Sequence, residues 1–297
     1  MDMRKNRKVG LAYGCIAAAS YGTNPLFALP LYNRGVGVNS VLFYRYFIAV
    51  ILYAIWIKFI KKHSLKITKD EILPLFMFGM LFSISSLTLF CAFKYIAVGL
   101  ACTILFIYPI IVALIMALFY KEKITKSVVF AIFLTSLGIF LLYNTNSGAS
   151  LNLYGVGLVL LSALSYALYI VGVKNNKAVK HMKGEKLSFY VMLFGLLVYI
   201  YNLKFCTQLQ VLHSPFLWLC TLGLSILPTI ISIETITIAI KLIGSTSTAI
   251  LGALEPLTAI VVGVLFFKEQ LTYRILCGVI FILFGVMLVI LRNNKKH

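Results

Sequence analysis

Long apolar runs alternate along the chain with short polar segments that hold most of the charged residues. A bilayer core about 30 Å thick is crossed by roughly 20 apolar residues of helix, and the runs have about this length. The uncharged stretch 127–173 is too long for one span, and the turn-forming cluster at 144–150 divides it in two. The pattern therefore predicts ten transmembrane helices, at Val9–Pro30, Ser40–Ile57, Ile72–Phe93, Val98–Tyr120, 127–143, 151–173, Leu187–Leu203, Pro215–Ile240, Ser245–Phe267 and Ile275–Leu291.

Composition excludes two broad classes of protein. Hydrophobic residues make up 61% of the 297 positions, charged residues only 12%, and the mean hydropathy is +0.99. So few charges cannot cover the surface of a soluble globular enzyme, and the hydrophobicity is far too high for a disordered chain. We therefore expect an all-α integral membrane protein without a soluble domain.

The net charge of +19 would suggest a nucleic-acid partner in a soluble protein. Here the position of the charges favours another interpretation. If the N-terminus is cytoplasmic, most of the 27 basic residues fall in cytoplasmic segments, and few fall on the other side: Arg34, Lys94, Lys204, Lys268 and Arg274. This asymmetry predicts a multi-pass protein of the cell membrane with both termini inside, in contact with the lipid bilayer and not with nucleic acid. The first apolar run is expected to stay as a helix rather than act as a cleaved signal peptide, because nine more spans follow.

The residue types that commonly bind metals or cofactors are scattered along the sequence. The six cysteines show no paired spacing, and the histidines lie in loops or at the end of the chain: His63, His181, His213 and His297. A glycine-rich phosphate loop is absent from the sequence. We expect no metal, no cofactor and no enzymatic activity, since a membrane enzyme would need clustered His, Asp, Glu or Cys residues.

The chain contains an internal repeat. Sliding it by 147 positions aligns residues 87–143 with 234–290 without a gap, and twelve of these 57 positions are identical. Near the first span the offset becomes 145, which places Ser20-Tyr21 over Ser165-Tyr166. Each repeat holds five predicted spans, at 1–147 and 148–297, and an odd number places the second repeat in the membrane upside down. Inverted repeats are a recurring architecture of secondary transporters. The identical positions include Ala92/Ala239, Lys94/Lys241, Pro109/Pro256, Lys121-Glu122/Lys268-Glu269 and Gly138/Gly285.

Several motifs resemble the EamA family of the drug/metabolite transporter superfamily. They are Tyr44–Ala49, Ala92–Ile96, Tyr108-Pro109, Lys121–Thr125, Ala239–Pro256 and Phe267–Thr272. The resemblance covers essentially the whole chain and implies ten helices, cytoplasmic termini and a central cavity between the halves. It also implies transport of small metabolites, often amino acids and commonly outward, without fixing the substrate.

Glu255 is the first candidate for a transport site. It lies about ten residues into the ninth span, where a carboxylate is expensive unless it is protonated, paired or facing a cavity. Pro256 follows it. Because proline has no backbone N–H, the carbonyl of Gly252, one turn earlier, lacks its usual helical donor. Thr248, Gly252 and Glu255 share one small and polar stripe. The alternative is a structural carboxylate bonded to neighbouring helices, in a stripe that only packs helices closely.

Two further charged residues are possible coupling or gating groups. Glu234 lies in the eighth span, where it can reach water or pair with Lys241, two turns further on. Arg45 lies near the outer end of the second span. Its guanidinium can extend to the membrane surface or attract an anionic group of the substrate.

Aromatic and polar residues of the first and sixth spans complete the predicted cavity. Tyr108 occupies the repeat position of Glu255, and an aromatic ring beside a carboxylate suits an amine-bearing or amphipathic substrate. Tyrosines that only satisfy buried hydrogen bonds are the alternative. The remaining predicted residues are Tyr21, Asn24, Ser165, Tyr166, Tyr169 and Ser232.

Together these observations predict a secondary transporter that moves a small metabolite by alternating access, with export as the expected direction. The alternative within transport is a proton-coupled exporter of drugs or other cationic compounds, although the first span holds none of the acidic residues that smaller relatives use. We expect a small-molecule substrate, and a monomer is compatible with the sequence.

Overall fold

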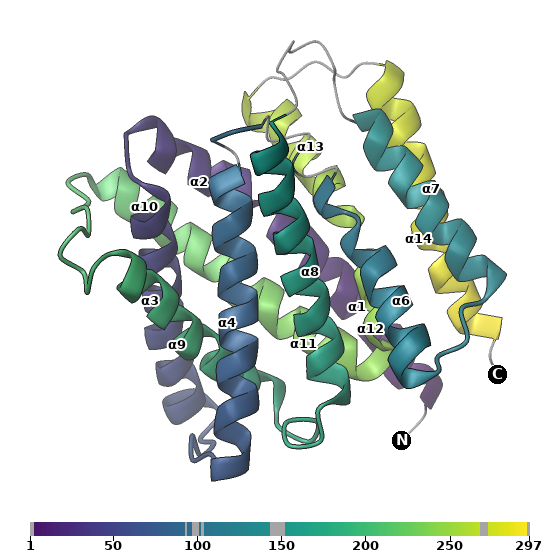
Figure 1. Ribbon diagram of the computed structural model, residues 1–297, viewed down its shortest axis with the longest axis horizontal. Helices are drawn as coiled ribbons and strands as arrows, with labels where there is room; N and C mark the ends of the chain where they lie inside the picture. Colours follow the sequence, from purple (N-terminus) through teal and green to yellow (C-terminus); the bar gives the residue numbers. More distant parts are fainter. Residues whose placement is uncertain are drawn as a thin grey trace.

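The computed structural model describes residues 3–92, 94–96, 101, 104–142, 152–267 and 273–295. Every regular element within these residues is a helix, and none is a strand. α1 begins and α14 ends at the same end of the helix bundle (Figure 1). We call this end the terminal side and the opposite end the far side.

The helices follow one another with short connections, as the apolar runs predict. The first half of the chain forms α1 (Met3–Gly22), α2 (Asn24–Asn33), α3 (Val38–Ile55), the π-helical turn η1 (Trp56–Ile60), α4 (Lys69–Ala92), α6 (Tyr108–Tyr120) and α7 (Lys126–Leu142). The second half forms α8 (Leu153–Asn175), α9 (Gly184–Asn202), α10 (Pro215–Ser225), η2 (Ile226–Ile231), α11 (Ser232–Ile243), α12 (Ser245–Leu251), α13 (Leu254–Phe267) and α14 (Tyr273–Lys295).

Proline interrupts two of the spans that we expected to be single helices. α1 stops at Gly22, the Thr23 hydroxyl donates to the Ser20 carbonyl at 2.6 Å, and α2 restarts with Pro25 in its first turn. Similarly, 245–267 forms two helices, α12 and α13, with Pro256 in the first turn of α13. Proline has no backbone N–H and cannot continue the hydrogen bonds of the preceding helix. Both breaks lie beside the cavity described below.

Glycines let the last helices of the two halves, α7 and α14, approach closely at one edge of the bundle (Figure 1). A Cβ atom added at Gly138 would lie 2.6 Å from the Gly278 carbonyl oxygen, and one added at Gly285 would lie 2.5 Å from the Thr135 side chain. Elsewhere α1 packs along α11, α4 along α8 and α9, and α3 along α9. Each half therefore packs mainly against the other.

The helices are suited to a membrane. Six spans are long and apolar enough to cross one: Val38–Ile60, Lys69–Ala92, Leu153–Asn175, Gly184–Asn202, Pro215–Ile243 and Ser245–Val262. Shorter apolar helices occur at Tyr108–Tyr120, Lys126–Gly138 and Leu276–Leu288. Large apolar side chains are exposed on the outside of the bundle, among them Phe119 at 77%. These features indicate a multi-pass membrane protein.

Candidate functional site

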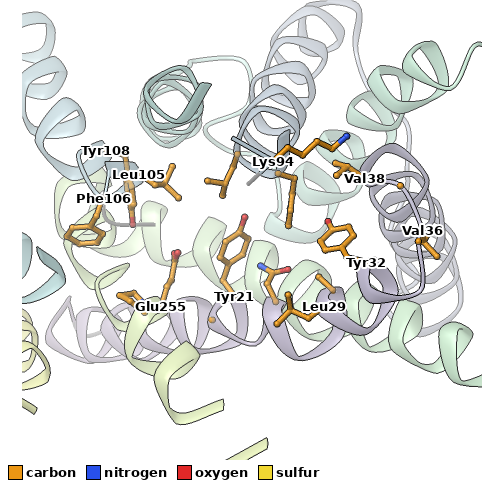
Figure 2. Close-up of a pocket in the computed structure, with 18 residues that line it drawn as sticks. Tyr21, Leu29, Tyr32, Val36, Val38, Lys94, Leu105, Phe106, Tyr108 and Glu255 are labelled. Carbon is orange, nitrogen blue, oxygen red and sulfur yellow. The ribbon is translucent and has the colours of Figure 1, made fainter. Parts of the chain in front are cut away.

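A cavity of about 500 Å³ is lined mainly by residues of the first half of the chain, and the second half contributes Glu255 and Pro256. Its mouth is formed by the exposed residues Gly35, Gly37 and Lys94, so it reaches the far side. Its inner end is formed by Tyr21, Tyr108 and Glu255, whose side chains point into the same space (Figure 2). The wall between is largely apolar and aromatic: Ala28, Leu29, Tyr32, Val36, Val38, Leu89, Phe90, Leu105, Phe106 and Pro256, with Gly22 and Asn24.

Two glycines set the inner end of the cavity. A Cβ atom at Gly22 would lie 2.4 Å from the Glu255 carbonyl oxygen, so only glycine lets α1 contact the start of α13 here. A Cβ atom at Gly252 would lie 1.7 Å from the Tyr108 hydroxyl, which crosses Gly252 to donate to the Ala249 carbonyl at 3.0 Å. The close approach at both glycines fixes the positions of Tyr108 and Glu255 relative to the first helix.

Glu255 lies in the first turn of α13 and lines the cavity. Within the described part of the chain, no cation lies within ion-pair distance of its carboxyl group. Unpaired N–H groups in the first turn of a helix favour a nearby negative charge. The carboxyl group can therefore meet a cation or a proton that enters the cavity.

Arg45 is buried, with no exposed surface, and does not extend to the membrane surface. Its Nε donates to the Thr229 hydroxyl at 2.5 Å and its Nη2 to the Pro228 carbonyl at 3.0 Å. The guanidinium carbon lies 5.7 Å from the centre of the Tyr21 ring, whose side chain lines the cavity. Arg45 thus supports the cavity wall from behind, and it contacts no carboxylate within the described residues.

Polar atoms of the cavity wall remain unsatisfied. The Asn24 side-chain oxygen and the Tyr32 hydroxyl are buried and make no hydrogen bond with the described residues. Buried polar atoms usually have partners, and exceptions cluster at functional sites. These two atoms are available to a bound molecule.

Other predicted residues lie outside the cavity wall in this structure. Tyr166 packs edge-on against Tyr108, with ring centres 4.9 Å apart, and stacks on Tyr169. Ser165 is buried on α8. The Ser232 hydroxyl donates to the Ala17 carbonyl at 3.1 Å, and the Thr248 hydroxyl to the Gly244 carbonyl at 2.8 Å.

Glu234 also lies away from the cavity. It accepts a long hydrogen bond of 3.5 Å from the Tyr53 hydroxyl. The expected pair with Lys241 is not formed, because the Lys241 ammonium donates to the Met182 carbonyl instead.

Sequence reasoning missed part of the cavity. Tyr32, Leu89, Phe106 and Lys94 line it without having been predicted. Only Lys94 had a usable signal, because it aligns with Lys241 in the repeat. The others are ordinary apolar or aromatic residues, whose orientation depends on the helix breaks.

Comparison with known proteins gives the family. The model of the EamA-like transporter family matches twice, over residues 8–144 and 153–291. A protein of Archaeoglobus fulgidus named "Uncharacterized transporter" is 27% identical over 192 residues, which are 64% of this chain and 66% of that protein. A solved structure described as "Crystal structure of protein" superposes with a TM-score of 0.78 and 17% identity, over 97% of this chain and 99% of that one. This last likeness concerns the fold.

Proposed function

Because the chain belongs to the EamA-like transporter family, with two family repeats, we propose that it is a secondary transporter that moves a small metabolite through the cavity between its halves. The observation that carries the proposal is a cavity that, within the described residues, opens at Gly35, Gly37 and Lys94 on the far side and has Glu255 at its inner end. A site open to one side and closed to the other is one half of an alternating-access cycle.

We further propose ten spans arranged as two inverted five-helix repeats. In support, α1 begins on the terminal side whereas α8, its repeat counterpart, begins on the far side (Figure 1). Two pairs of repeat counterparts also pack on each other, α3 on α9 and α7 on α14, as expected of helices that lie next to a two-fold axis between the halves. The lysine-rich loops between α3 and α4 and between α8 and α9 support a cytoplasmic terminal side in the cell membrane.

The proposed substrate is a small amphipathic molecule that carries an amine. Glu255 supplies an anionic acceptor, Asn24 a neutral acceptor and Tyr21 and Tyr108 aromatic faces for a cation. The volume of about 500 Å³ lies within the usual range for small-molecule sites. Amino acids and amines fit this description, and export follows from the resemblance to family members. The alternative is proton-coupled export of larger cationic compounds.

Uptake into proteoliposomes tests the proposal. We would screen radiolabelled amino acids, amines, sugars, nucleosides and a cationic dye, with and without a pH gradient, for the wild type and Glu255→Gln. We expect saturable uptake of an amine-bearing compound and a large loss in Glu255→Gln. Asp70→Asn, which alters an exposed carboxylate on the terminal side, is the matched control and should keep wild-type flux.

Two results would count against the proposal. Uptake of no compound in the panel, together with turnover of a membrane substrate, would favour an enzyme. Gradient-driven uptake that is unchanged in Glu255→Gln would exclude this carboxyl group as the coupling site.

A further inference from the structure

Lys241 lies in the last turn of α11 and bonds to the loop that follows α8. Its ammonium donates to the carbonyl of Met182, in the segment between α8 and α9. The Lys174 ammonium, near the end of α8, donates to the Lys241 carbonyl at 2.9 Å, and the Ser245 hydroxyl donates to the Ile170 carbonyl at 3.2 Å. These bonds tie the end of α8 to the end of α11, and no residue of α8 or α11 lines the cavity.

Lys94 is the repeat counterpart of Lys241 and lies at the open mouth of the cavity. Lys241 lies in the last turn of α11, and Lys94 lies two residues beyond the last residue of α4. Its side chain is exposed, extends toward Val38 (Figure 2) and makes no hydrogen bond with the described residues. The two counterpart lysines thus differ: Lys241 is bonded on the terminal side, and the Lys94 side chain has no hydrogen-bond partner among the described residues.

The acceptor of Lys241 also has a counterpart at the mouth. Met182 stands two places before Gly184, the first residue of α9, and Val36 stands two places before Val38, the first residue of α3. Both side chains are 8% exposed. Val36 lines the cavity mouth together with Lys94. The far side therefore holds a donor, Lys94, and an acceptor, the Val36 carbonyl, that correspond to the Lys241–Met182 bond of the terminal side.

We propose that Lys94 and Lys241 are the latches of two mirror-related gates, one of which is closed at a time. The proposal rests on the proposed transport function. Lys241 bonded to the Met182 carbonyl closes the terminal gate, as in this structure. When the far gate closes, Lys94 donates to the Val36 carbonyl and Lys241 releases Met182.

Lysine suits such a latch. Its four-carbon stem is flexible, and its ammonium carries three donors that are well solvated when the gate is open. In a closed gate the ammonium loses water and bonds a backbone carbonyl, and a hydrogen bond to a charged group is stronger than a neutral one. A backbone acceptor makes the latch independent of a carboxylate partner.

Cysteine labelling of the purified protein in detergent tests the latch without a substrate and without regard to membrane orientation. The probes are Leu89→Cys and Ile236→Cys, in a background in which the six native cysteines are replaced. Leu89 lines the far-side cavity and is 6% exposed, whereas its repeat counterpart Ile236 is 8% exposed and does not line the cavity. The maleimide labelling rate at each probe reports how often its gate is open.

Lys241→Met removes the donor and keeps most of the stem. We expect labelling at Ile236→Cys to rise by about tenfold, as the loss of one charged hydrogen bond implies, and labelling at Leu89→Cys to fall by a smaller factor. Lys94→Met should have the opposite effect, keeping Leu89→Cys accessible and Ile236→Cys protected. Lys241→Arg keeps a donor and should restore much of the wild-type pattern, while Lys180→Met, on the exposed part of the α8–α9 segment, is the matched control.

The opposite effects distinguish a latch from a general loss of stability, which would raise labelling at both probes in both variants. Equal effects of the two lysine variants, or none, would overturn the proposal. If the cysteine of Ile236→Cys stays unlabelled in the wild-type background and in all variants, even with a saturating amine ligand, the proposed alternating access is rejected. A ligand that exposes Ile236→Cys regardless of the lysines would reject the latch alone.

Discussion

Gly252→Ala provides a sharp test of how the inner end of the cavity is built. The added methyl carbon would lie 1.7 Å from the Tyr108 hydroxyl oxygen, whereas ordinary contacts begin near 3.4 Å. The hydroxyl must therefore move by roughly 1.5 Å in a close-packed interior, which breaks its 3.0 Å bond to the Ala249 carbonyl. Overpacking and the lost bond together are expected to lower the free energy of unfolding by about 2–4 kcal/mol.

A double variant separates this cause from others. Tyr108→Phe removes the hydroxyl, and the nearest atoms to the new methyl then become the Ala249 carbonyl oxygen at 3.0 Å and the ring carbon Cζ at 3.1 Å. These contacts are tight but can relax. Tyr108→Phe alone should cost less than about 2 kcal/mol, since single hydrogen bonds between membrane helices contribute little. The double variant should regain at least about 1 kcal/mol relative to the sum of the two single changes.

Reversible unfolding in mixed detergent micelles, followed by circular dichroism, measures the four proteins of this cycle. Gly157→Ala, where no atom lies within 4 Å of the added methyl group, is the control for substituting a glycine in a helix. If the double variant loses as much stability as the sum of the single variants, Tyr108 does not pass over Gly252, and the geometry of the inner end is wrong.

Three further predictions follow from the same structure. Gly22→Ala places a methyl group 2.4 Å from the Glu255 carbonyl, so transport and melting temperature should both fall relative to Gly157→Ala, and unchanged flux would contradict the contact between α1 and α13. Gly285→Ala, with a contact of 2.5 Å to Thr135, should lower the free energy of unfolding by about 1–3 kcal/mol, and Gly285→Ala with Thr135→Ser should recover part of it. His63→Ala removes a partly exposed bridge to Glu185 and should change the free energy of unfolding by less than about 1 kcal/mol. A larger change in a denaturant titration would show that the bridge contributes to stability.

The fold class could be predicted because the membrane limits the possible structures. Apolar runs of about 20 residues must be helices there, and the repeat indicates that helices of one half have counterparts in the other. The positions of the helix ends were less predictable. Pro25 and Pro256 were visible in the sequence, but only the structure shows that each separates two helices instead of bending one.

The candidate site was predictable where a residue is unusual for its depth. Glu255 and Asn24 attract attention because carboxyl and amide groups are rare in a membrane span, and both line the cavity. Ser165, Tyr169 and Thr248 were selected by the same criterion of polarity and lie in packed regions. Under the alternating access proposed above, the difference depends on which end of the bundle is closed, and one sequence has to encode both states.

The seam between α7 and α14 has a consequence for the origin of the chain. Gly138 packs on Gly278 and Ile282, and Gly285 packs on Ala131 and Thr135, which are the residues that correspond to Gly278 and Ile282 in the other half. Each half thus presents the same patch to the other, as subunits do in an isologous dimer. Two separate copies of a half-length chain, inserted in opposite orientations, would need no new surface to associate there. The seam between α7 and α14 therefore has the symmetry of an isologous dimer interface within a single polypeptide.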